Sequence, residues 1–69
     1  MKRVRRKIAA ALTALEDELI QREKTQIRIS KNLAGTVYDQ RFRYHTELLL
    51  RLQASLQEIL SLVDDILED

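Results

Sequence analysis

Apolar and polar positions along the chain follow two heptad ladders, one in each half. In the second half, steps of four and three residues join, without interruption, the positions Tyr38, Phe42, His45, Leu49, Leu52, Leu56, Ile59, Val63 and Ile66. In the first half, the same alternation joins Arg5, Ile8, Leu12, Leu15, Leu19, Arg22, Gln26, Ile29 and Leu33. Because this spacing keeps one face of an α-helix turned toward a partner helix, the ladders predict two long helices that pack together.

The residues between the ladders are suited to a reversal of the chain. Gly35 can adopt the left-handed conformation that ends a helix, and Thr36 followed by Asp39 forms a short capping box. If the chain turns back here, every ladder position meets another, from Leu33 opposite Tyr38 to Arg5 opposite Ile66. We therefore predict one all-α domain over residues 1–69, an antiparallel two-helix coiled-coil hairpin with helices over about 2–32 and 37–68 and a turn at 33–36.

Several apolar residues lie outside both ladders and are expected to form an oligomer or partner interface. They are Ile20, Ile27, Leu48, Leu50, Leu60, Leu62 and Leu67. A chain of 69 residues without Cys has a small core and no disulfide, so association is the remaining source of stability. We expect two hairpins to pair as a homodimeric four-helix bundle, or one hairpin to bind the helices of another protein.

A polar layer interrupts the predicted contact between the helices. Gln26 is expected to face His45, with Arg22 one step away opposite Leu49. A polar layer in an apolar seam selects one register over slipped ones, which is the interpretation that the sequence favours. The alternative is a pH switch, since a protonated His45 would place a charge inside the bundle.

The charges are nearly balanced, with a net charge of +1, which gives no general attraction to nucleic acid or to a membrane. Five basic residues near the start are Lys2, Arg3, Arg5, Arg6 and Lys7, and four acidic ones near the end are Asp64, Asp65, Glu68 and Asp69. A hairpin brings both groups to the same end, where they neutralise each other. The basic, amphipathic residues 1–15 also fit a targeting presequence, but their heptad phase continues into Leu19 and favours a helix.

The turn half carries an excess of basic residues around one aromatic side chain. The candidate nucleic-acid surface consists of Arg28, Lys31, Arg41, Arg43 and Tyr44. Arginines could contact phosphates while the tyrosine ring stacks on a base, so a small RNA-binding hairpin dimer is one alternative function.

Catalytic and metal-binding patterns are missing from the sequence. The single His has no nucleophile or second metal ligand at helical spacing, and no Gly-rich phosphate loop occurs. We expect no catalytic residues, metal or cofactor, and no membrane span. The sequence favours a non-enzymatic protein–protein interaction or assembly module; a further alternative is a chaperone or complex subunit that needs a heterologous partner. The lack of Cys is compatible with the cytoplasm or another reducing compartment.

Overall fold

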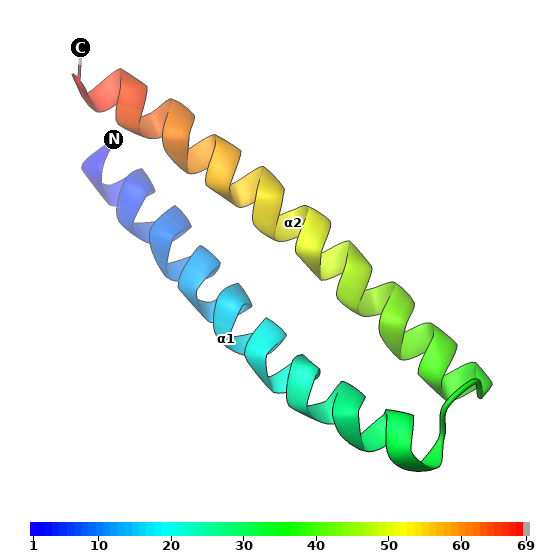
Figure 1. Cartoon of the computed structure of the whole chain (residues 1–69). Helices are drawn as coiled ribbons and strands as arrows, with labels where there is room; N and C mark the ends of the chain where they lie inside the picture. Colours follow the sequence, from blue (N-terminus) through cyan, green and yellow to red (C-terminus); the bar gives the residue numbers. More distant parts are fainter. Residues whose placement is uncertain (69) are drawn as a thin grey trace.

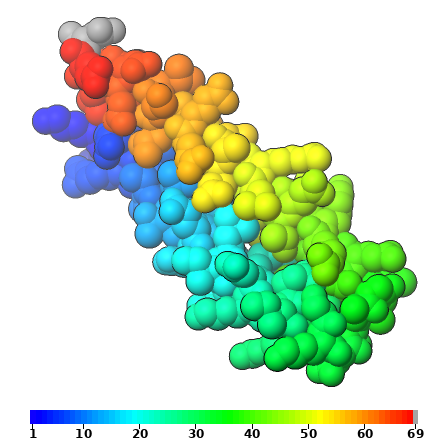
Figure 2. Space-filling view, in the orientation of Figure 1, coloured from blue at the N-terminus to red at the C-terminus, as the bar shows by residue number. Residues whose placement is uncertain are grey.

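The protein is an antiparallel helical hairpin, as its two ladders predict. The computed structural model describes residues 1–68, with α1 at Lys2–Asn32 and α2 at Val37–Glu68. The helices run side by side along their whole length, and the two ends of the chain lie together at the end opposite the turn (Figure 1). The principal extents of 52 × 15 × 12 Å describe a rod, and Figure 2 shows atoms of the two helices in contact along it.

The turn between the helices is fixed by local hydrogen bonds. The amide of Leu33 donates to the carbonyl of Ile29, and the amide of Thr36 donates to the carbonyl of Leu33 at 3.1 Å. Gly35 has a φ of 79°, the left-handed conformation predicted for it. The hydroxyl of Thr36 accepts a hydrogen bond from the amide of Asp39 at 3.2 Å, as expected of an N-cap.

The hydrophobic core is thin because only one stripe of each helix is covered. The apolar side chains that are buried are Leu12, Leu15, Ile29 and Val63, and no side chain among the described residues is less than 2% exposed. In α1, the covered residues follow the predicted ladder from Arg5 to Ile29. Leu33 lies beyond it and is exposed.

The predicted orientation of α2 is wrong by a rotation of about 50° around the helix axis. Four ladder residues face α1 as expected: Phe42, Leu49, Leu56 and Val63. The other five are exposed, and four of them are replaced in the contact by the residue one position later: Asp39, Thr46, Gln53 and Leu60. Arg22 bonds to Thr46 and to the carbonyl of Phe42 instead of lying opposite Leu49.

The polar residues of the contact account for this rotation. Asp39 is 4% exposed, and burying a carboxylate is costly unless it accepts several hydrogen bonds. The observed orientation places Asp39 beside Gln26 and places the Thr46 hydroxyl beside Arg22. In the predicted orientation, Arg22 would have faced Leu49, which offers no side-chain acceptor.

Candidate interaction surface

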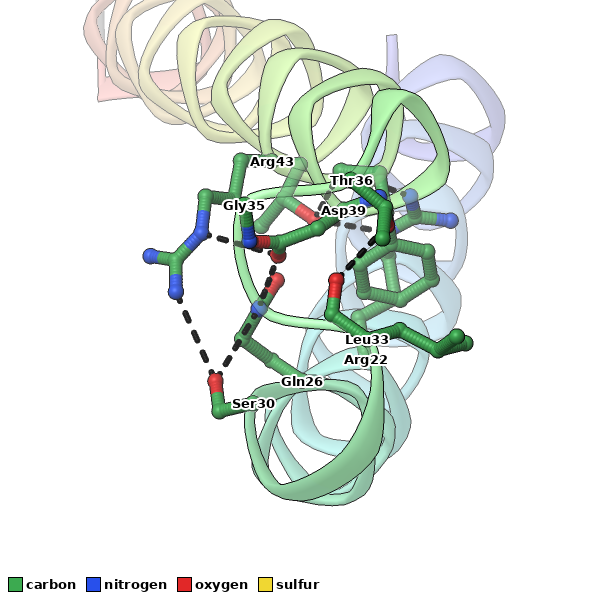
Figure 3. Close-up of polar contacts among 10 residues, drawn as sticks. Arg22, Gln26, Ser30, Leu33, Gly35, Thr36, Asp39 and Arg43 are labelled. Atoms are coloured by element: carbon green, nitrogen blue, oxygen red, sulfur yellow. Dashed lines mark hydrogen bonds and ion pairs between the residues drawn. The ribbon is translucent and has the colours of Figure 1, made fainter.

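The most polar part of the hairpin is a hydrogen-bonded cluster around Asp39 that fastens the turn (Figure 3). The Asp39 carboxylate accepts bonds from the Gly35 amide at 2.9 Å, the Gln26 amide group at 2.8 Å and Arg43 Nε at 3.0 Å. The bond from the Gly35 amide, followed by that from Gln26, lowers the pKa of Asp39 below its ordinary value. Every donor comes from the hairpin itself, so this cluster is structural.

Arg22 forms a second polar anchor near the middle of the rod. Its Nε donates to Thr46 Oγ1 at 2.9 Å, and one terminal nitrogen donates to the Phe42 carbonyl at 3.2 Å. The guanidinium carbon also lies 4.1 Å from the centre of the Phe42 ring, within the range of a cation–π contact. These contacts hold Arg22 in the seam and fix which residues of α2 lie opposite it.

The predicted layer of Gln26 and His45 is wrong. Gln26 bonds to Asp39, while His45 is exposed and lies against the ring of Tyr44, with ring centres 5.9 Å apart. An exposed imidazole places no charge in the contact between the helices when it is protonated. Neither the register-selecting layer of Gln26 and His45 nor its alternative, a pH switch at His45, therefore has a basis in the hairpin.

The candidate nucleic-acid residues do not form one surface. Arg41 and Arg43 are two positions apart on α2, which separates their directions by about 200° around the helix. The guanidinium of Arg43 bonds to Asp39 and, at 3.4 Å, to the hydroxyl of Ser30. Arg28, Lys31, Arg41 and Tyr44 are exposed. Arg43 is exposed too, with 58% of its side chain accessible while it makes these bonds.

The charged ends of the chain meet as expected. Arg5 forms an ion pair with Asp64 across the two helices, and this bond raises the pKa of Arg5. The arrangement supports the neutralisation predicted for the terminal clusters, whose last member, Asp69, lies outside the described residues.

Most of the apolar residues assigned to an interface are exposed. These residues are Ile20, Ile27, Leu48, Leu50, Leu62 and Leu67. Leu60 is the exception: it is half-buried and lies in the contact with α1, so its assignment to a partner surface is wrong. The rotation of α2 adds further apolar residues to the exposed surface, among them Leu52 at 48%, Ile59 at 44% and Ile66 at 56% exposure.

The exposed residues of α2 form a second heptad ladder beside the first. Steps of three and four residues join Tyr38, Arg41, His45, Leu48, Leu52, Ser55, Ile59, Leu62 and Ile66, all of which are exposed. We call its apolar part the α2 stripe and define it as Leu48, Leu52, Ile59, Leu62 and Ile66. Residues with this spacing lie along one face of a helix.

A second apolar area is a shallow groove on the hairpin, lined by residues of both helices. Its large apolar members are Leu19, Ile20, Ile27 and Leu50. Three carboxylates, those of Glu16, Glu23 and Glu47, also line it. Arg22 and Arg43 line the groove as well, so groups of both charges border its apolar residues.

Within residues 1–68, neither helix has a stretch long and apolar enough to cross a membrane. The same residues contain no group of His, Cys, Asp and Glu side chains that could hold a metal ion. Comparison of the chain with protein-family models, with characterised proteins and with solved structures finds no match.

Proposed function

We propose that the protein is a non-enzymatic assembly module that binds another helix through the α2 stripe, and that a second copy of the chain is its first partner. The observation that carries the proposal is the exposed ladder of α2, in which large apolar side chains recur at heptad spacing. Contiguous apolar surface of this kind is typical of protein–protein contacts.

The accessible surface of the chain supports the proposal. A compact monomer of 8.1 kDa is expected to expose about 4,500 Å². The hairpin exposes 5503 Å², because a rod of two helices covers only one stripe of each. The excess of about 1,000 Å² is close to the roughly 800 Å² that each partner buries in a standard interface. A second hairpin on the stripe would bring the exposed surface down to the ordinary value.

The alternatives have less support. RNA binding has less support because Arg41 and Arg43, both exposed, lie on different sides of α2. A heterologous partner would use the same stripe, so a chaperone or complex subunit differs from the proposal only in the identity of the second helix. We infer a homotypic contact first because it needs no further component.

The test is to place charges on the stripe and, as a matched control, in the groove. Leu52→Lys with Ile59→Lys should abolish association, while Ile20→Lys with Ile27→Lys should leave it intact. All four residues are between 44% and 55% exposed in the hairpin, and Lys has a higher helix propensity than Ile. Any loss of association is therefore a loss of the contact and not of a helix.

Size-exclusion chromatography with light scattering would measure the mass, and circular dichroism at 222 nm the helix content. The proposal predicts a dimer for the unmodified chain and for the groove variant, and a smaller species for the stripe variant. A stripe variant that associates like the unmodified chain would overturn the proposal. A chain that forms polydisperse aggregates, with the stripe variant relieving them, would indicate a heterologous partner.

A further inference from the structure

The exposed ladder of α2 is apolar toward the end of the helix and polar toward the turn. From Leu48 onward it consists of the α2 stripe with Ser55 as a single interruption, whereas its three residues nearest the turn are Tyr38, Arg41 and His45. A second copy of α2 gains most by covering the apolar part and leaving the polar part in water. This difference between the two ends limits how two copies can be aligned.

Parallel packing of two α2 helices does not meet this requirement. The parallel arrangement that keeps the two copies equivalent sets every ladder residue against its own copy. Arg41 would then lie against a second Arg41, one heptad from the apolar Leu48. Because like charges in contact repel and are costly to remove from water, the ladder favours antiparallel helices.

One antiparallel alignment covers the stripe almost entirely with itself. Every stripe residue except Ile59 lies opposite another stripe residue of the second copy, and Ile59 lies opposite Ser55. We call this alignment the stripe register and define it by the pairs of Leu48 with Ile66 and of Leu52 with Leu62, each of which forms twice by symmetry. Within residues 1–68 of the second copy, no residue lies opposite the three polar ladder residues, so these stay exposed.

Antiparallel alignments that keep the ladders matched differ by steps of one heptad, and both neighbours of the stripe register match less of the stripe. A shift toward the turn leaves Leu48 opposite Ile59 and brings Ile66 against Arg41. A shift toward the other end leaves Ile59 opposite Leu62, and residues 1–68 of the second copy then offer nothing opposite Leu48. Burial of apolar side chains therefore favours the stripe register.

The edge of the stripe on the side away from α1 carries charges that meet across the stripe register. This edge consists of Tyr44, Arg51, Glu58 and Asp65, which recur every seven residues and are exposed. None of its three charged members forms an ion pair within residues 1–68. In the stripe register, Arg51 lies beside Asp65 of the second copy, twice, whereas Glu58 lies beside its own copy on the two-fold axis. The edge thus contributes two favourable pairs and one unfavourable pair.

We propose that two copies associate through antiparallel α2 helices in the stripe register, with Glu58 facing its own copy on the two-fold axis and weakening the dimer. This inference rests on the proposed function, because it requires that the α2 stripe binds a second copy. It adds the direction, the register and the residue that limits the affinity. Charged residues beside a heptad seam influence orientation and partner choice in paired helices generally.

Substitutions of Glu58 test the proposed axis. Glu58→Gln removes the repulsion between the two carboxylates and should tighten the dimer about threefold. Glu58→Arg exchanges one pair of like charges for another and should keep the affinity within about threefold of that of the unmodified chain. In the two neighbouring registers, Glu58 would face Arg51 or Asp65 of the second copy, so Glu58→Arg would change two pairs and shift the affinity about tenfold.

Mixing Glu58→Arg with the unmodified chain gives the most specific result. The mixed dimer has a carboxylate facing a guanidinium on the axis, so its ratio to the two unmixed dimers should be about threefold above the statistical ratio. Native mass spectrometry resolves the three dimers, because Glu and Arg differ in mass. Glu47→Arg is the matched control: Glu47 is exposed on the same helix, lines the groove and gives the same change in net charge. Its mixture with the unmodified chain should stay at the statistical ratio.

The outcomes separate the register from the proposed function. If the unmodified chain dimerises and Glu58→Arg shifts the affinity about tenfold, or its mixture stays at the statistical ratio, the stripe register is wrong and the proposed function stands. If the Glu47→Arg mixture shows the same excess of mixed dimer, net charge drives the pairing and the inference is overturned. If the unmodified chain does not dimerise at all, the inference fails together with the homotypic contact.

Discussion

Two isoleucines on α1 provide a direct comparison between a buried and an exposed position. Ile29 is 4% exposed in the seam, and Ile27, two residues earlier, is 55% exposed beside the groove. We predict that Ile29→Ala destabilises the protein by about 2 kcal/mol, while Ile27→Ala changes its stability by less than about 0.5 kcal/mol. Both changes replace the same side chain in the same helix.

The magnitude follows from burial and helix propensity. Replacing a buried Ile by Ala costs about 2–5 kcal/mol, and a seam open to solvent on both sides favours the lower end because it can relax. That range already includes the roughly 0.4 kcal/mol of helix propensity by which Ala exceeds Ile, so the net cost expected at Ile29 is about 2 kcal/mol. At Ile27, less than half of the side chain is buried, so this gain offsets most of the loss.

Urea unfolding at one protein concentration, followed at 222 nm, would measure both effects. A small domain loses about 1–3 kcal/mol of stability per molar urea, so the midpoint of Ile29→Ala should fall by about 1–2 M. The midpoint of Ile27→Ala should stay within a few tenths of a molar of the unmodified value. Equal shifts for the two variants would mean that Ile27 is covered in solution, and the groove, not the α2 stripe, would then be an interface.

Three further predictions concern the polar anchors and the turn. Folding lowers the pKa of Asp39, so its carboxylate stabilises the protein above the ordinary pKa of 3.8, and this stabilisation is lost as the pH falls through the lowered pKa. Asp39→Asn should therefore reduce the loss of stability that the protein shows in acid, and Asp17→Asn, at an exposed site, should not. Gly35→Ala should cost about 1 kcal/mol for the left-handed backbone alone, since no atom lies within 4 Å of the added carbon, and Gly35→Asn should cost less; equal thermal stability of the three proteins would contradict this. Thr46→Val, which removes the acceptor of Arg22, should lower the free energy of unfolding in urea by about 1 kcal/mol, and Thr46→Ser should lower it by under half as much. An unchanged stability of Thr46→Val would mean that Arg22 does not bond to Thr46.

The hairpin itself could be predicted because its evidence is local or periodic. The α1 ladder, the left-handed Gly35 and the Thr36 cap each follow from residue types at fixed spacing, and the structure shows all three. The pairing of Arg5 with the acidic end also follows from the reversal of the chain alone.

The orientation of α2 could not be predicted from apolar spacing, because α2 carries two overlapping ladders that share one helix. The predicted seam ladder, with Leu52 and Ile59, and the observed one, with Asp39 and Thr46, both have regular heptad spacing, and the predicted ladder is the more apolar of the two. What decides between them is the hydrogen bonding of Asp39 and Arg22, which a count of apolar positions leaves out. Arg22 could have indicated the orientation of α2, because a guanidinium in the seam needs an acceptor and Thr46 carries the hydroxyl nearest to its expected partner, Leu49.

The rotation of α2 also explains why the α2 stripe is exposed. The polar anchors take one side of α2 for the intrachain contact, so Leu52, Ile59 and Ile66 are left on the outside. A sequence whose only task was to fold as a single hairpin would not need apolar residues there. The surplus of apolar positions on α2 therefore points to a second helix contact.

Sedimentation equilibrium of the unmodified chain over a wide concentration range would show whether the hairpin forms a dimer. We expect a mass that rises with concentration from 8.1 kDa to twice that value and then stays constant. A mass that remains at 8.1 kDa at the highest concentrations, or one that increases without reaching a plateau, would contradict a closed dimer formed on the α2 stripe.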